Sequence, residues 1–178
     1  MTAATLSLAS AYYAEGRLDD AEVLLRRVLT SYEASLGNEH PRMVVALNAL
    51  ATLQYKKQQY TAAEALYLKA VKIQEAGNGP VHDSLARTLH NLGLCYAAQG
   101  RYQDAELVYH RSLTIAEQSF GPAHQDVAVI LADYATVLRK LRKKNEARSL
   151  EKQARVLRAR DRESPSRFEV DWRELKNR

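Results

Sequence analysis

Cysteine, proline and glycine are scarce in this chain of 178 residues. The single cysteine, Cys95, excludes an internal disulfide and leaves the cellular compartment open. Apolar residues make up 46% of the chain and charged residues 26%, which argues against disorder. Because alanine and leucine are abundant while the helix-breaking residues are rare, the composition predicts a helical protein.

Long hydrophobic runs are also missing. No apolar run approaches the roughly 20 residues that a helix needs to cross a bilayer, so we expect no membrane span. Residues 1–15 have neither the basic start nor the continuous apolar stretch of a signal peptide. We therefore expect a cytoplasmic protein. The thiol of Cys95 falls on the apolar face of a predicted helix, where we expect it to be buried in the core.

Catalytic and cofactor motifs are absent from the sequence. There is no nucleophile paired with a base, no phosphate-binding glycine loop and no metalloprotease helix motif. We therefore expect a protein that is not an enzyme and has no cofactor.

The net charge of +5 is unevenly distributed along the chain. Residues 1–138 hold 11 Lys/Arg against 14 Asp/Glu, residues 139–162 hold 11 against 3, and residues 163–178 hold 4 against 4. The basic segment 139–162 suggests binding to nucleic acid or an anionic membrane surface as one alternative function, because clustered cations bind phosphates. We favour a solvated end face, since the cations are spread around the two predicted helices and no aromatic residues are interleaved with them.

The chain repeats itself every 42 residues. Four windows align without a gap: GRLDDAE at 16–22, QQYTAAE at 58–64, GRYQDAE at 100–106 and RKKNEAR at 142–148. The same register holds Ala21, Ala63, Ala105 and Ala147, then Gly37, Gly79 and Gly121, and then His40, His82 and His124. Chance does not keep several residue types in phase in this way, so the chain is a repeat protein.

The three in-phase histidines are not predicted to bind a metal. Each falls in a separate loop between repeats, and packed helices lie about 8–10 Å apart. Zinc ligands must lie within about 2.3 Å of the ion. We expect instead that each histidine orders its own loop through a hydrogen bond.

Each repeat is predicted to contain two helices that pack against each other. The first helix of the second copy carries Leu47, Leu50, Ala51 and Gln54 along one stripe, at i, i+3, i+4 and i+7. Its second helix carries Ala63, Leu66, Tyr67 and Ala70. Glycine and proline in the linkers end each second helix. We therefore predict an array over residues 1–162, with repeats at 2–36, 42–78, 84–120 and 126–162, followed by an extended tail over residues 163–178.

These residues resemble a known family. A small residue and an aromatic or leucine close the first helix, and alanine, aromatic and alanine follow at fixed offsets in the second. This pattern is similar to the tetratricopeptide repeat, whose unit has about 34 residues. The longer unit, the LGNEHP linker and the stretch GRYQDAELVYHRSLTIAEQSFG resemble the kinesin-light-chain type. The resemblance implies an all-α, right-handed superhelical solenoid of about four antiparallel helix hairpins that binds a protein or peptide.

The two ends of the array differ. The fourth copy carries Glu151 and Arg155 at positions that are apolar in the other copies, so we expect the array to terminate there. The first copy opens with Leu6 and Leu8 and shows no such polar conversion. One alternative function is therefore a structural or oligomerising module that docks through its N-terminal repeat.

By the family resemblance, ligands bind the concave face that the first helices line. The predicted contacts are Asn48, Thr52, Tyr55, Lys56, Arg87, His90, Asn91, Asp133, Thr136, Arg139 and Lys140. Asparagine amides can bond a peptide backbone, and the cations favour acidic side chains. Arg87 and Asn91 partly resemble a carboxylate clamp, but Val45 and Ser7 do not complete it. We therefore predict an internal acidic peptide segment as the ligand; the alternative is that these residues are merely solvated.

The tail carries aromatic residues among acidic ones. Phe168 and Trp172 lie in FEVDWREL, which resembles the tryptophan–acidic peptides that kinesin-light-chain-type repeats accept. One hypothesis is that the tail occupies the groove of its own chain, or of a second copy, and competes with the ligand. The alternative is that both aromatic residues fold back on the last hairpin as an apolar cap.

Overall fold

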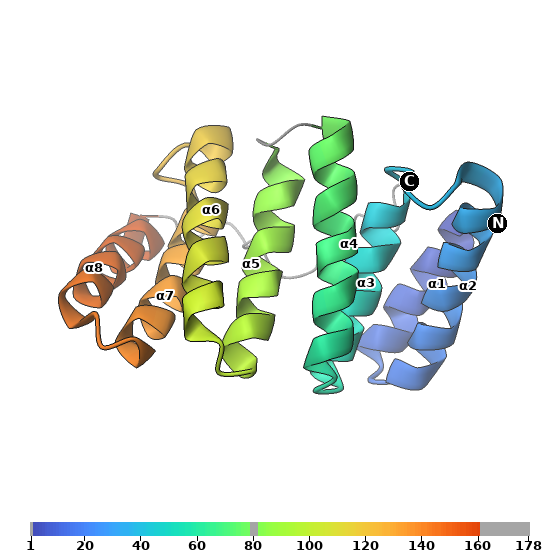
Figure 1. Ribbon diagram of the computed structural model, residues 1–178, viewed down its shortest axis with the longest axis horizontal. Coiled ribbons are helices and arrows are strands. Elements are labelled where there is room, and N and C mark those ends of the chain that lie inside the picture. Colours follow the sequence, from blue (N-terminus) through green and yellow to red (C-terminus); the bar gives the residue numbers. More distant parts are fainter. Residues whose placement is uncertain (1, 79–81, 161–178) are drawn as a thin grey trace. The chain divides into compact units, whose positions relative to one another are not determined.

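The structure is a computed structural model that describes residues 2–78 and 82–160. The described residues form eight helices and no strand, arranged as successive antiparallel pairs (Figure 1). The prediction of an all-α fold is therefore confirmed. The chain divides into two compact units, with the boundary between Gly77 and Asn78.

The first unit contains two helix hairpins. Its helices are α1 (Thr2–Ala14), α2 (Leu18–Leu36), α3 (Met43–Lys56) and α4 (Tyr60–Asn78). They share one hydrophobic core, in which Leu25, Leu47 and Leu53 are at most 1% exposed. Burying apolar area of this kind is the main driving force for packing the two hairpins together.

The second unit also contains two hairpins. Its helices are α5 (Asp83–Ala98), α6 (Tyr102–Phe120), α7 (Gln125–Lys140) and α8 (Lys144–Arg160). Tyr109 of α6 is fully buried, and its ring stacks on that of Tyr134 at a centroid distance of 6.0 Å. The hydroxyl of Ser112 donates to the carbonyl of Ala86 at 2.7 Å, which ties α6 to α5.

Small residues allow the paired helices to approach closely. The in-phase alanines of the second helices are all 0% exposed: Ala21, Ala63, Ala105 and Ala147. The turn inside each hairpin needs one residue in the left-handed region. Gly16 and Gly100 supply it at φ 77° and 75°, whereas Gln58 and Arg142 adopt φ 60° and 62° at the equivalent positions. The last two carry the strain of a side chain in this region.

The histidines order the loops that precede the first helices, as predicted. The Nδ1 atom of His40 accepts the Arg42 amide at 3.1 Å, and that of His124 accepts the Asp126 amide at 3.2 Å. His82 is the N-cap of α5 and accepts the Ser84 amide at 3.3 Å. The predicted hydrogen bonds are confirmed. Over the described ranges, no three metal-ligating side chains cluster.

Two further expectations concern the core and the membrane. Cys95 is 0% exposed, which confirms the prediction of a core thiol. Among the helices of the described residues, none is both long and apolar enough to cross a bilayer.

Candidate functional site

In the first unit, α3 and α1 carry the predicted contact residues and an aromatic neighbour. The ammonium of Lys56 lies over the ring of Tyr13, 4.2 Å from its centroid, which holds the cation by a cation–π contact. The ring of Tyr55 lies 5.4 Å from that of Tyr60 at the start of α4. Lys56 is exposed and Tyr55 is half-buried. The first unit therefore presents an exposed cation held over one aromatic ring.

Two other predicted residues of α3 are already engaged within the unit. The hydroxyl of Thr52 donates to the carbonyl of Asn48 at 3.0 Å and lies 2.7 Å from the hydroxyl of Tyr67. Tyr67 is 2% exposed, so this contact fastens α3 to α4. Asn48 and Thr52 are half-buried. Both residues precede Lys56 on α3, and the contact of Thr52 with Tyr67 also packs α3 against α4.

In the second unit, the structure brings His90 and Asp133 together. The Nε2 atom of His90 lies 2.8 Å from a carboxylate oxygen of Asp133, which links α5 to α7. The side chain of His90 is 4% exposed, and its ring packs edge-on against Tyr109 at 5.6 Å. His90 therefore orients Asp133, whose side chain is 39% exposed.

The other predicted contact residues of the second unit differ in their burial and in the contacts that their side chains make. The side-chain nitrogen of Asn91 is buried and has no hydrogen-bond partner among the described residues. Arg139 pairs with Glu151 of α8 at 2.7 Å. Thr136 is exposed and bonds the carbonyl of Ala132. Arg87 is half-buried and Lys140 is exposed.

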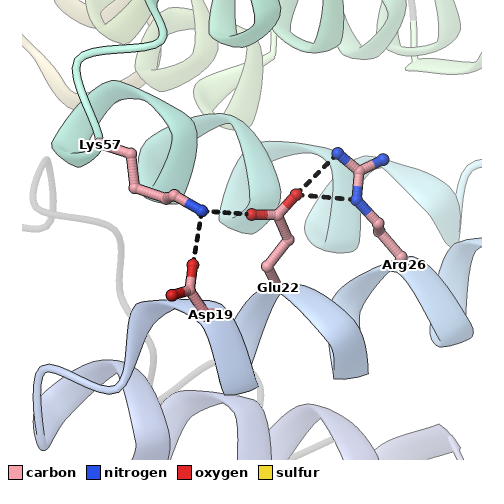
Figure 2. Close-up of polar contacts among 4 residues, drawn as sticks. All are labelled: Asp19, Glu22, Arg26 and Lys57. Atoms are coloured by element: carbon pink, nitrogen blue, oxygen red, sulfur yellow. Dashed lines mark hydrogen bonds and ion pairs between the residues drawn. The ribbon is translucent and has the colours of Figure 1, made fainter.

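A polar cluster joins α2 to the end of α3 in the first unit (Figure 2). Lys57 donates to Asp19 at 2.7 Å and to Glu22 at 2.8 Å, and Arg26 pairs with the other oxygen of Glu22 at 2.7 Å. Burial alone would raise the pKa of Glu22, but its hydrogen bonds, led by that from Lys57, outweigh burial and lower it. The hydrogen bonds to Asp19 and Glu22 raise the pKa of Lys57. Because these four side chains pair within the cluster, they hold α2 of the first copy against the end of α3 in the second copy.

The exposed cations of α8 lie along one side of that helix. We expected them to be spread around the helices, and over α8 this is wrong. Five exposed cations recur at spacings of four, four, three and three residues along α8: Lys144, Arg148, Lys152, Arg155 and Arg158. At about 100° per residue these positions share one side of the helix. We call this set the α8 stripe.

The α1 end of the first unit exposes apolar surface. Leu8 is 44% exposed, whereas the equivalent Leu50 and Leu92 are each 1% exposed. Ala4 and Ala11, on the same side of α1, are also exposed. Docking through this repeat remains a prediction. The tail residues Phe168 and Trp172, named above as a candidate ligand, lie outside the described residues.

A family model matches most of the chain. The model described as "Tetratricopeptide repeat" matches residues 1–76, 42–118 and 84–158 in three overlapping placements. A comparison with curated proteins finds no match.

Solved structures share the fold. BtubC (BKLC) from P. vanneervenii matches with a TM-score of 0.80 and 22% identity, over 90% of this chain and 65% of that one. A variant of a Podosopora anserina putative kinesin light chain with nearly identical TPR-like repeats matches with a TM-score of 0.77 and 26% identity, over 92% of this chain and 77% of that one. The apo form of RapI matches with a TM-score of 0.80 and 20% identity, over 90% and 57%. This chain thus spans less than two thirds of BtubC. These likenesses confirm the predicted fold class of helix-hairpin repeats, about four in number.

Proposed function

Because the chain belongs to the tetratricopeptide repeat family, we propose that it is a non-catalytic scaffold that binds an extended acidic segment of a partner protein. The ligand would contact first helices, either α3 of the first unit or α5 and α7 of the second. The observation that carries this proposal is the cation of Lys56, held exposed over the ring of Tyr13.

The charges of the first helices support an acidic ligand. Lys56 and Lys140 are exposed and Arg87 is half-buried, while the carboxylate of Asp133 is held by His90. A cation attracts a carboxylate most strongly where burial reduces solvent screening, which favours Arg87 as a contact. The amide of Asn91, one turn after Arg87 on α5, would donate to a backbone carbonyl of the segment once its side chain turned outward from its buried position. Tyr13 and Tyr55 offer apolar surface to side chains between the acidic residues.

A peptide titration tests the proposal. The probe is a synthetic, fluorescently labelled peptide in which aromatic residues alternate with aspartate and glutamate. Lys56→Glu and Arg87→Glu should each weaken its binding roughly tenfold, since each replaces an attraction by a repulsion. Arg27→Glu is the matched control, because it makes the same charge change on an exposed position of α2. Added salt should weaken binding by the wild-type protein.

Two results would contradict the proposal. One is an equal loss of affinity in Arg27→Glu, which would mean that the net charge of the protein, and not the first-helix face, attracts the probe. The other is undiminished binding of a probe whose acidic residues are replaced by asparagine and glutamine. Such a result would show that the contact is apolar.

The α8 stripe supports a second candidate function, the binding of an anionic polymer or surface. Five cations on one side of a helix attract phosphates. Such binding displaces counterions from the phosphates, and it falls steeply with added salt because their release is then less favourable. A duplex DNA probe separates the two candidates. Arg148→Glu combined with Arg155→Glu should abolish its binding under this second candidate and leave the acidic peptide bound.

A further inference from the structure

An open groove lies on the last hairpin, beside the α8 stripe. It has a volume of about 400 Å³ and runs between α8 and the loop that follows α6. Its lining residues are Pro122, Ser149, Lys152, Gln153, Val156 and Leu157. Val156, a large apolar side chain of this lining, is 43% exposed. We call this feature the α8 groove.

The second copy of the repeat carries an exposed ion pair at the equivalent place. There Lys72 of α4 reaches Glu39 of the loop before α3. The equivalent positions, 84 residues later, hold Val156 and Ala123. The fourth copy thus carries apolar residues where the second copy carries an ion pair, and apolar side chains line part of the open groove. An apolar occupant would cover them.

We infer that the α8 groove is the docking site of this chain's own segment 168–174. The segment reads FEVDWRE and lies outside the described residues. Phe168 and Trp172 supply apolar surface for Val156 and Pro122. Each aromatic side chain can bury about 150–250 Å², so one ring is enough to cover the exposed part of Val156.

Charge and chain length support this occupant. Lys152 lies at the rim of the groove within the α8 stripe, and the segment carries Glu169 and Asp171 beside its aromatic residues. Val156 stands four residues before the end of α8, about 6 Å along the helix. The chain from Arg160 to Phe168 can span up to roughly 26 Å, so the segment can return to the groove with slack.

Because the linker is short, even a weak contact between the segment and the α8 groove is enough for docking. A tethered segment meets its site at an effective concentration in the millimolar range. Docking therefore needs only a modest intrinsic affinity. This inference does not rest on the proposed function, since it uses none of the first-helix residues.

Trp172 provides the test, because it is the only tryptophan in the chain. The full-length protein is excited at a wavelength that its tyrosines do not absorb, and tryptophan emission and quenching by acrylamide are recorded. In the wild type we expect blue-shifted emission and at least twofold weaker quenching than in the protein unfolded by guanidinium. Both should be independent of protein concentration, because the contact is within one chain.

Val156→Asp should move both signals toward the unfolded values, since placing a charge in the groove lowers the docked-to-undocked ratio by about tenfold or more. Leu107→Asp is the matched control: Leu107 is 70% exposed on α6, so the substitution should leave the signals unchanged. If Val156→Asp alters the helical circular dichroism, Lys152→Glu replaces it. That variant should shift the signals in the same direction by repelling Glu169 and Asp171, and more strongly at low salt.

Several outcomes would overturn the inference. Wild-type emission equal to that of the unfolded chain would show that Trp172 is not docked. A blue shift that Val156→Asp and Lys152→Glu leave unchanged would place Trp172 elsewhere, for example on the first helices. Signals that change with protein concentration would assign the groove to the tail of a second copy.

Discussion

Replacing Gly93 by alanine should destabilise the protein, although the same replacement normally stabilises a helix. Gly93 lies in α5 at a position where the other copies carry Ala9, Ala51 and Ala135. A Cβ at Gly93 would lie 2.9 Å from both Cε2 and Cζ of Tyr109 and 3.0 Å from its Cε1. Contacts this short require the tyrosine ring to move.

The ring has little room to move. Tyr109 is 0% exposed and is held between His90, at 5.6 Å, and Tyr134, at 6.0 Å. Overpacking a core in this way costs about 1–3 kcal/mol, and here the upper half of that range applies. The helix gains about 1 kcal/mol when glycine becomes alanine. The free energy of unfolding should therefore fall by about 1–2 kcal/mol.

Urea unfolding followed by circular dichroism measures this change, and Tyr109→Leu provides the control background. Leucine at this position reproduces the first copy, where Ala9 faces Leu25. Without the ring, Gly93→Ala should raise the free energy of unfolding by about 1 kcal/mol, so the sign of its effect reverses. If Gly93→Ala is equally destabilising in both backgrounds, or stabilises the wild-type protein, the contact with Tyr109 is not the reason for the glycine.

The remaining predictions concern a turn and an ion cluster. Arg142→Gly should raise the free energy of unfolding by about 1 kcal/mol, because glycine adopts the φ of 62° without strain; Arg148→Gly, at an exposed position inside α8, should lower it by a similar amount, and equal effects would refute the reasoning. The pKa of Glu22 in the folded protein lies below its ordinary value of 4.5, which applies to the unfolded chain. Its contribution to stability is therefore complete above that pH and is lost as the pH falls through the folded-state value. Urea unfolding across this acid range should show a smaller fall in the free energy of unfolding for Glu22→Gln than for the wild type. If the variant shows the same fall as the wild type, other carboxylates account for it.

The sequence was sufficient for those features that one repeat shares with the next. The 42-residue register identified the paired helices, the buried alanines and the loop histidines, because each is fixed by contacts within a hairpin or its own loop. His124 illustrates this, since its acceptor nitrogen and the Asp126 amide are two residues apart. Local geometry of that kind recurs wherever the local sequence recurs.

The partners of polar side chains could not be predicted in the same way. Periodicity places His90 on one side of its helix, but it does not show that Asp133, 43 residues later, receives its hydrogen bond. Arg139 similarly meets Glu151 across the last hairpin. Such pairs depend on how far two helices are displaced along each other, which spacing within either helix does not reveal. The α8 stripe is hidden when the cations of both helices of the hairpin are taken together, because only those of α8 follow its helical spacing.

The differences between copies carry more functional information than their agreement. Agreement at Ala21 or Ala147 reports the packing that every hairpin needs, so it cannot distinguish a binding site from a scaffold. Where copies disagree in two contacting positions at once, packing alone gives no reason for the change. Val156 and Ala123, which stand where the second copy pairs Lys72 with Glu39, are one such case. Gly93 is a change at a single position, because the second copy carries Ala51 and Tyr67 where the third carries Gly93 and Tyr109. The second is explained by an interior contact, because the ring fills the space. The first leaves an open groove with apolar side chains in its lining, which the proposed docking of segment 168–174 would explain.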